Sequence, residues 1–305
     1  MAKNLIGSEW LNASDGAIIK ITNPATNEFI DSVPESTKKD CDAAVQAAKK
    51  GQKLWVKRPL HERAAILMKF VSLVERDKDK LAKLLSDETG KPITEAYGEI
   101  GNVSIGIPAF CEKAKHEYGN MIPAGQENGN ENTLQYTVQA PLGVVVAIIP
   151  FNFPSDLFCQ KIPAALLMGN SVIMKPSPHN PLTLTKYAEL LLEAGVDEGA
   201  INVINGTGGM AAQALAANPG VSLVSLTGAT KSGIETMKTC SQNLTHLMLE
   251  LGGNDAFILD RDGDVDLAVE ETIWGRLYNT GQVCCASKRF LIHNSVKKEY
   301  ITKLK

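Results

Sequence analysis

The chain has 305 residues, enough for one large or two ordinary domains and for a sizeable buried core. Its 44% hydrophobic and 21% charged residues are typical of an ordinary soluble protein, and a net charge of −3 argues against nucleic acid as a partner. The longest strongly apolar run, 144–150, is far too short to span a bilayer, so no membrane partner is expected.

The cysteines also exclude several classes of protein. The six are Cys41, Cys111, Cys159, Cys240, Cys284 and Cys285. They form no CxxC pair and have no histidine at zinc-site spacing, so no metal is expected. A disulfide framework is unusual in a chain this long and this poor in cysteine. The first residues, MAKNLIGSEW, lack the apolar stretch of a secretory signal, and we predict a cytoplasmic protein with free thiols.

The first part of the chain predicts helices. Apolar residues recur at spacings of three and four, which predicts helices over 39–57 and 59–87. Glycine and proline residues interrupt the pattern soon afterwards. The polar stretch 125–137 predicts a loop that leads into an exposed hairpin strand.

From residue 143 onward, short β-branched runs alternate with helical segments. Strands are predicted at 143–149, 171–175, 201–204, 221–226 and 244–249, with helices at 182–195, 210–217 and 232–240. A strand at 255–259, a helix to about 278, a strand at 289–293 and an amphipathic helix from about 296 follow. This alternation predicts βαβ units, a parallel sheet and an α/β fold, with a ligand at the carboxyl ends of the strands.

Two glycine-bearing turns lie between predicted strands and helices. The segment 206–211, GTGGMA, has the spacing of a dinucleotide fingerprint, but no acidic residue follows about 20 positions later. The segment 228–233, GATKSG, lacks the GK[ST] ending of a P-loop. Small residues before a helix let backbone N–H groups approach a phosphate, and they also simply permit a tight turn. The residues alone leave both interpretations open.

Three polar residues stand at or just after the ends of predicted strands. Lys175 could grip a ribose or phosphate, or could be a solvated lysine. Asn152, in PFNFP, could donate to an oxyanion, or could form a turn. Glu250 ends an apolar strand before two glycines, where burial would raise its pKa and suit it to proton transfer. A capping or ion-pair role is its alternative.

Cys284 has small and polar neighbours in NTGQVCCASKRF, which are not typical of a core cysteine. A thiol near a helix start could be a nucleophile of low pKa. A lone cysteine is more often inert, so the surroundings alone do not decide between these readings.

The order of these motifs resembles that of the aldehyde dehydrogenase superfamily. PFNFP is similar to its oxyanion-asparagine motif, MKPSPHNP to its adenosine-ribose segment and LTGATKSG to its cofactor turn. LELGGN and NTGQVCCA resemble its glutamate and cysteine signatures, and their joint appearance is highly specific. The similarity runs from about residue 5 to the last residue.

The resemblance implies a mechanism for oxidising an aldehyde to a carboxylic acid. Cys284 would attack the aldehyde, and Cys285 would be only a neighbour. The Asn152 amide and the Cys284 backbone N–H would hold the oxyanion, and hydride transfer would leave a thioester. Glu250 would activate the water that hydrolyses it. Two rivals are an enzyme that passes the acyl group to coenzyme A, against which Glu250 argues, and a non-catalytic relative.

The resemblance also implies NAD or NADP as cofactor. The residues it places at the cofactor are Ile149, Pro150, Lys175, Ser177, Gly208, Gly228, Ala229, Gly233 and Leu251. Many NAD-preferring members carry glutamate where this chain has Pro178, so repulsion against a 2′-phosphate is removed and NADP becomes plausible. Ala229 replaces the serine of many members, which removes one phosphate contact.

The domain organisation follows from the same resemblance. Residues 1–122 and 142–253 would form a Rossmann-type cofactor domain, 123–141 an oligomerisation hairpin, and 254–305 the beginning of an α/β catalytic domain. Family members normally continue well beyond this point. We therefore expect an incomplete chain that is inactive or nearly so alone, and a homo-oligomer, dimer or tetramer, when full length.

Overall fold

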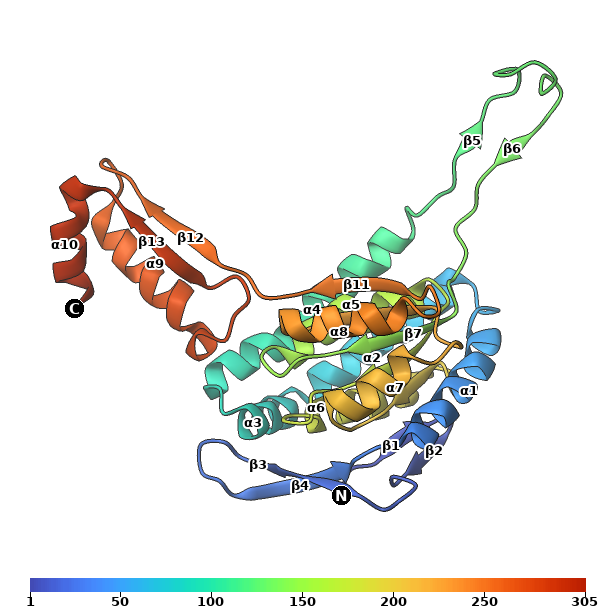
Figure 1. Ribbon diagram of the computed structural model, residues 1–305, viewed down its shortest axis with the longest axis horizontal. Helices are drawn as coiled ribbons and strands as arrows, with labels where there is room; N and C mark the ends of the chain where they lie inside the picture. Colours follow the sequence, from blue (N-terminus) through green and yellow to red (C-terminus); the bar gives the residue numbers. More distant parts are fainter.

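The computed structural model describes residues 1–305 and is built around a seven-stranded sheet (Figure 1). The strand order is β11-β10-β7-β8-β9-β1-β2. The strands are β1 (Asn4–Ile6), β2 (Glu9–Leu11), β7 (Val144–Ile148), β8 (Ser171–Lys175), β9 (Ile201–Val203), β10 (Leu223–Thr227) and β11 (His246–Glu250). Strands β7 to β11 are parallel, and β1 and β2 add an antiparallel edge. The expected α/β fold with a parallel sheet is confirmed.

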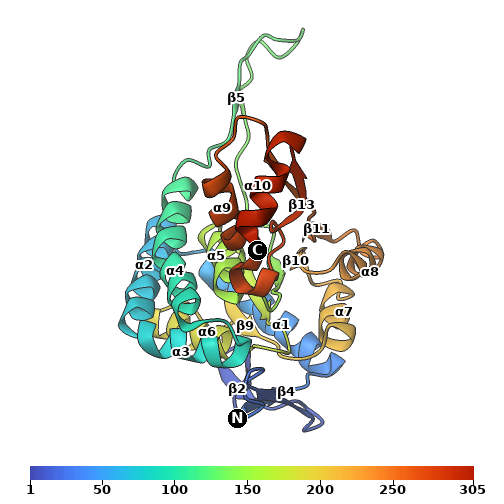
Figure 2. The ribbon, with the colours of Figure 1, turned by 90° about the vertical axis from the view of Figure 1, so that its left-hand side faces the viewer.

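Helices cover both faces of the sheet because its central strands are apolar on both sides. In β7, Val145 and Ala147 pack into one hydrophobic cluster, and Val144 and Val146 pack into another. The first face is covered by α2 (Leu60–Arg76), α3 (Lys78–Thr89), α4 (Ile93–Ala114), α5 (Pro154–Leu167) and α6 (Leu182–Ala194). The second is covered by α1 (Lys38–Trp55), η1 (Gly208–Ala212), α7 (Gln213–Ala216) and α8 (Thr230–Cys240). Figure 2 shows these two layers on opposite sides of the sheet.

Three further units lie outside the main sheet (Figure 1). Strands β3 (Ile18–Thr22) and β4 (Phe29–Pro34) form an antiparallel pair, and β5 (Met121–Ile122) and β6 (Gln135–Tyr136) form a projecting arm. The last unit contains β12 (Asp255–Leu259), α9 (Val265–Leu277), η2 (Tyr278–Gly281), β13 (Ser287–Ile292) and α10 (Asn294–Leu304). No helix in the chain has the length and apolar character needed to cross a membrane.

Two local predictions are wrong. The helix expected over 59–87 is interrupted at Asp77, where φ is −102° and ψ is 13°. At the break, Arg76 forms ion pairs with Asp77 and with Glu193 of α6. The two helices α2 and α3 each pack against α4 and α6. The helix expected over 210–217 is α-helical only from Gln213, where α7 begins. Its first residues belong instead to the π-helix η1 that follows the 206–211 turn.

The register of the sheet aligns its strand ends. Ile148 at the end of β7 lies beside both Lys175 of β8 and Leu226 of β10. Thr227 of β10 lies beside Glu250 of β11. After β8 and β9 extend the sheet on one side of β7, β10 returns to the other side. The strand order therefore reverses between β7 and β10, which is where open α/β sheets bind ligands.

One glycine tests the packing of α1 on the rest of the fold. A Cβ added to Gly51 would lie 2.1 Å from the Gly199 backbone carbon, so Gly51→Ala should lower the free energy of unfolding by about 1–3 kcal/mol. Gly98 on α4 has no atom within 4 Å of the corresponding position, so Gly98→Ala should stabilise by about 0.5–1 kcal/mol. Urea denaturation of both variants measures the difference. Equal effects would contradict this account.

Candidate active site

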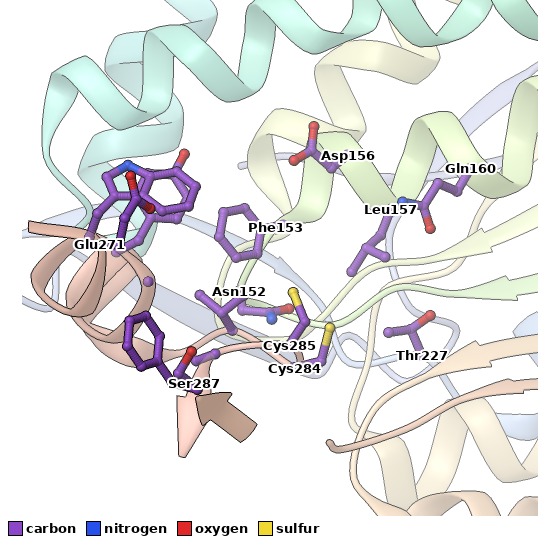
Figure 3. Close-up of a pocket in the computed structure, with 16 residues that line it drawn as sticks. Asn152, Phe153, Asp156, Leu157, Gln160, Thr227, Glu271, Cys284, Cys285 and Ser287 are labelled. Carbon is purple, nitrogen blue, oxygen red and sulfur yellow. The ribbon is translucent and has the colours of Figure 1, made fainter. Parts of the chain in front are cut away.

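A cavity of about 520 Å³ opens between the end of β7 and the β12–β13 unit (Figure 3). Its lining residues are Asn152, Phe153, Asp156, Leu157, Gln160, Thr227, Phe257, Glu271, Trp274, Gly275, Tyr278, Val283, Cys284, Cys285, Ala286 and Ser287. Figure 3 shows the two cysteine sulfurs near Asn152 and Thr227. The structure thus brings together Cys284 and Asn152, which the sequence separates by more than a hundred residues.

Cys284 is exposed and its thiol is free. It lies in a turn between η2 and β13, and not near a helix start as the sequence suggested. The chain reaches this turn through Asn279 and Thr280, whose φ values of 47° and 58° are unusual for residues other than glycine. Asn279 is buried, and its backbone N–H donates to Glu95 over 3.0 Å. This contact helps hold the strained turn that precedes the thiol.

Cys285 shares the cavity with Cys284, and its thiol has a shifted pKa. Burial raises the pKa of the Cys285 thiol, and the neighbouring Cys284 adds to the effect through its charge and a hydrogen bond. The reactive form of a thiol is the thiolate. The surroundings of Cys285 therefore disfavour its use as a nucleophile.

Asn152 joins β7 to the cysteine segment. Its Nδ2 donates to the Gln282 carbonyl over 2.9 Å, and one amide hydrogen remains for another acceptor. Its own backbone carbonyl accepts from Lys91 Nζ and Asn279 Nδ2, each over 2.9 Å. Lys91 is buried and forms an ion pair with Glu99 of α4. The Asn152 backbone is consequently held from two separate elements.

Glu250 ends β11, but it is exposed and does not line the cavity. The burial expected from its apolar strand is absent, because β11 is the edge of the sheet and only alternate residues are covered. Lys161 of α5, which the sequence analysis missed, is the nearby cation. Burial lowers the pKa of Lys161 to about 8, and the charge of Glu250 opposes this shift. Lys161 Nζ donates to Ser225 Oγ over 2.9 Å.

Gly253, three residues after Glu250, lets the chain pass close to the backbone of Cys284. A Cβ added to Gly253 would lie 2.6 Å from the Cys284 carbonyl oxygen, whereas Gly252 has open space around it. The Cys284 carbonyl also accepts from Lys288 Nζ over 2.8 Å. The glutamate and cysteine signatures therefore meet in space through Gly253.

The residues expected at a cofactor lie along the carboxyl edge of the sheet and outside this cavity. Ile149 is buried and Pro150 half-buried directly after β7. Lys175 is buried at the end of β8, where its Nζ donates to the Pro176 carbonyl over 2.9 Å, and burial lowers its pKa to about 8. Ser177 is also buried, and its Oγ accepts from the His179 N–H.

The glycine turns supply the rest of this edge. Gly208 is exposed in η1 with open space around it, and Ala229 is the exposed N-cap of α8. Gly228 donates its N–H to the Glu250 carbonyl over 3.0 Å. Gly233 is buried against Leu251, whose Cδ2 would lie 2.8 Å from an added Cβ. An open helix N-terminus and a buried lysine without an ion-pair partner fit an anionic dinucleotide.

Lys91, Asn279 and Lys161 had no distinctive pattern in the sequence. Lys91 forms an ion pair with Glu99, which lies eight residues later on α4. Asn279, in the last unit of the fold, donates a hydrogen bond to the backbone carbonyl of Asn152. No local sequence pattern marks contacts of this kind, because their partners lie on other elements of the fold. Lys91 is buried and Lys161 half-buried, and no signal in the sequence distinguishes them from the exposed lysines.

Comparison with known proteins decides the family. The model of the aldehyde dehydrogenase family matches residues 10–305. The chain belongs to this family. The resemblance inferred from the motifs is therefore confirmed, and so is the expected fold.

Relatives within the family are named for several different activities. The chain is 36% identical over 300 residues to the succinate-semialdehyde dehydrogenase [NADP(+)] GabD of Escherichia coli (strain K12), covering 98% of this chain and 61% of that protein. It is 36% identical over 301 residues to the D-glyceraldehyde dehydrogenase (NADP(+)) of Picrophilus torridus, covering 99% and 60%.

A solved structure of a family member also matches the chain closely. The succinate-semialdehyde dehydrogenase from Burkholderia pseudomallei superposes with a TM-score of 0.96 at 34% identity, covering 100% of this chain and 62% of that one. The chain thus spans about three fifths of the length of the relatives it matches.

The close approach of Gly253 to Cys284 makes a prediction. Gly253→Ala should displace the cysteine turn, lower the free energy of unfolding by about 1–3 kcal/mol and change the rate at which iodoacetamide modifies Cys284. Gly252→Ala, its neighbour in open space, should change neither. Peptide mapping after timed alkylation gives the rate for each variant. Matching rates in the two variants would show that the contact does not hold the thiol.

Proposed function

We propose that the protein containing this chain oxidises an aldehyde to a carboxylic acid with NAD or NADP, through a thioester on Cys284. The observation that carries the proposal is an exposed, free thiol that shares a cavity with the Asn152 amide at the carboxyl edge of a parallel sheet. Relatives named as NADP(+)-dependent aldehyde dehydrogenases support it.

The first step uses Cys284 and Asn152. The Cys284 sulfur attacks the aldehyde carbon, and the carbonyl oxygen gains negative charge. The Asn152 amide hydrogen that does not bond Gln282 is available to donate to that oxygen. Because Lys91 and Asn279 already hold the Asn152 backbone, little reorganisation is needed when the charge develops.

The second step needs a hydride acceptor, which bound NAD or NADP would supply. Lys175 and Ser177 would hold the adenosine ribose, and the turns at Gly208 and Gly228–Gly233 would approach the phosphates with backbone N–H groups. Ile149 and Pro150 would line the nicotinamide side. Pro178 is half-buried and carries no charge, so nothing at this position repels a 2′-phosphate. We therefore propose that NADP is used at least comparably to NAD.

The third step is hydrolysis of the thioester, for which we propose Glu250 as the base. Its exposed carboxylate is accessible to water, and it ends the strand next to β10, at the carboxyl edge of the sheet. A base that activates water would be counterproductive in an enzyme that passes the acyl group to coenzyme A. Glu250 is therefore also the residue that favours hydrolysis over that alternative.

We also retain the proposed organisation of the whole protein. Residues 1–122 and 142–253 would form the cofactor domain and 254–305 part of the catalytic domain. The arm at 123–141 would join copies of the chain in a dimer or tetramer, because it projects with exposed Leu134, Tyr136 and Val138. Six free cysteines suit a cytoplasmic location.

The nucleophile is tested with paired substitutions. Cys284→Ala should abolish aldehyde-dependent reduction of NAD(P) in the protein that contains this chain, whereas Cys285→Ala should keep most of the rate. Absorbance of the reduced cofactor measures both. Iodoacetamide labelling with peptide mapping is an independent check. Loss of activity through modification of Cys285, with Cys284 unmodified, would overturn the assignment.

Glu250 is tested by separating hydride transfer from hydrolysis. Glu250→Gln keeps the shape of the side chain but removes the base, so rapid mixing should give a burst of reduced cofactor followed by a slow steady state. Glu235→Gln, an exposed glutamate on α8, is the control and should turn over normally. A normal steady-state rate in Glu250→Gln would remove this residue from the mechanism.

A further inference from the structure

The cavity at Cys284 has an unbalanced charge. Asp156 and Glu271 are its only charged lining residues, and no lysine, arginine or histidine lines it. Neither carboxylate takes part in an ion pair. Figure 3 shows them on either side of Phe153, with Cys284 below. A ligand that enters this cavity therefore meets negative charge.

Three lysines near the cavity donate to other groups. Lys91 pairs with Glu99 and donates to the Asn152 carbonyl. Lys288 donates to the carbonyl of Cys284 from outside the lining. Lys161 donates to Ser225. Each of these ammonium groups thus has a partner of its own, and none of them forms an ion pair with Asp156 or Glu271, although the charge of Lys91 acts on Asp156 from a distance.

The two carboxylates are held differently. Asp156 is half-buried, and Asn102 Nδ2 donates to its Oδ1 over 2.9 Å. Burial raises the pKa of Asp156, and the Asn102 hydrogen bond and the charge of Lys91 oppose that rise. Glu271 is exposed on α9, three residues before Trp274, so the two side chains share one face of the helix.

Aromatic rings complete the wall of the cavity. Tyr278 stacks on Phe153 with 5.7 Å between ring centroids and on Trp274 with 5.5 Å. Trp274 is 65% exposed, so part of its ring is free to contact a ligand. Tryptophan is the best ring for binding a cation over its face, and Glu271 lies beside it. Carboxylates, aromatic rings and no basic residue together match an ammonium group.

We propose that this cavity selects aldehydes whose tail carries a protonated or quaternary ammonium group and disfavours aldehydes with a carboxylate tail. That the ligand is an aldehyde rests on the proposed function, whereas the charge preference belongs to the cavity itself. The E. coli relative is named for succinate semialdehyde, which has a carboxylate tail. The proposal therefore predicts a different substrate class for this chain from the one that names that relative.

The charge preference can be measured on the thiol directly. In a Cys285→Ser chain, Cys284 is the one exposed cysteine, because the other four are buried. Two methanethiosulfonate reagents of similar size, one with a trimethylammonium group and one with a sulfonate, each form a disulfide with the thiolate and release methanesulfinate. The rate of each reagent with Cys284 is divided by the rate of the same reagent with 2-mercaptoethanol. The ratio of the two quotients, cationic over anionic, does not depend on the pKa of the Cys284 thiol.

We expect the cationic reagent to react roughly tenfold faster at low salt, with the ratio falling in 0.5 M salt. Glu271→Gln and Asp156→Asn should each lower the ratio by about threefold. Glu270→Gln is the matched control, since Glu270 is an exposed neighbour on α9 that does not line the cavity, and it should leave the ratio unchanged. Thermal unfolding checks that each variant is folded.

The outcomes separate this inference from the proposed function. A ratio at or below one in the Cys285→Ser chain overturns it, as does a ratio that neither Glu271→Gln nor Asp156→Asn lowers. In the protein containing this chain, kcat/KM should be higher for a trimethylammonium aldehyde than for butanal, and lowest for succinate semialdehyde; the reverse order overturns it. A cation-favouring ratio without oxidation of any aldehyde would uphold the charge preference and count against the proposed function.

Discussion

The arrangement at Cys284 depends on the backbone carbonyl of Asn152. This carbonyl accepts from the buried Lys91 ammonium and from the Asn279 amide, and the Asn152 side chain in turn donates to Gln282. Lys91 is kept in place by Glu99, whose other oxygen accepts from the backbone of α5. Breaking a buried ion pair of this kind typically costs about 3–5 kcal/mol, because the remaining charge has no partner. The pair therefore connects the stability of the helical layer to the position of the Asn152 amide.

The cysteine turn is built in the same way from long-range contacts. Asn279 and Thr280 adopt left-handed backbone conformations that cost free energy, and the Glu95 and Asn152 contacts of Asn279 offset that cost. Gly253 then allows the segment after β11 to approach the Cys284 carbonyl closely. Strain at the turn is thus compensated by hydrogen bonds from two other parts of the fold.

Charge is distributed unevenly around the site. Lys91, Lys161 and Lys288 lie near the site, and each donates to a carbonyl or a hydroxyl group. The two carboxylates that line the cavity, Asp156 and Glu271, form no ion pair. Burial lowers the pKa values of the half-buried Lys161 and the buried Lys175 to about 8. The two lysines lie towards Glu250 and towards the end of β8, where the proposed mechanism needs a base and a ribose contact.

The sequence alone determined the α/β class, the strands from β7 to β11 and the positions of Asn152, Lys175 and Glu250 at or after strand ends. Such features follow from periodicity and turn residues, which depend on neighbours along the chain. Only the tertiary structure decided that Glu250 is exposed, that α2 and α3 are separate and that Lys91 and Asn279 meet at Asn152. It also decided that Asp156 and Glu271 share a cavity without a cation. These outcomes depend on burial and on pairing between distant elements, which a local pattern does not encode.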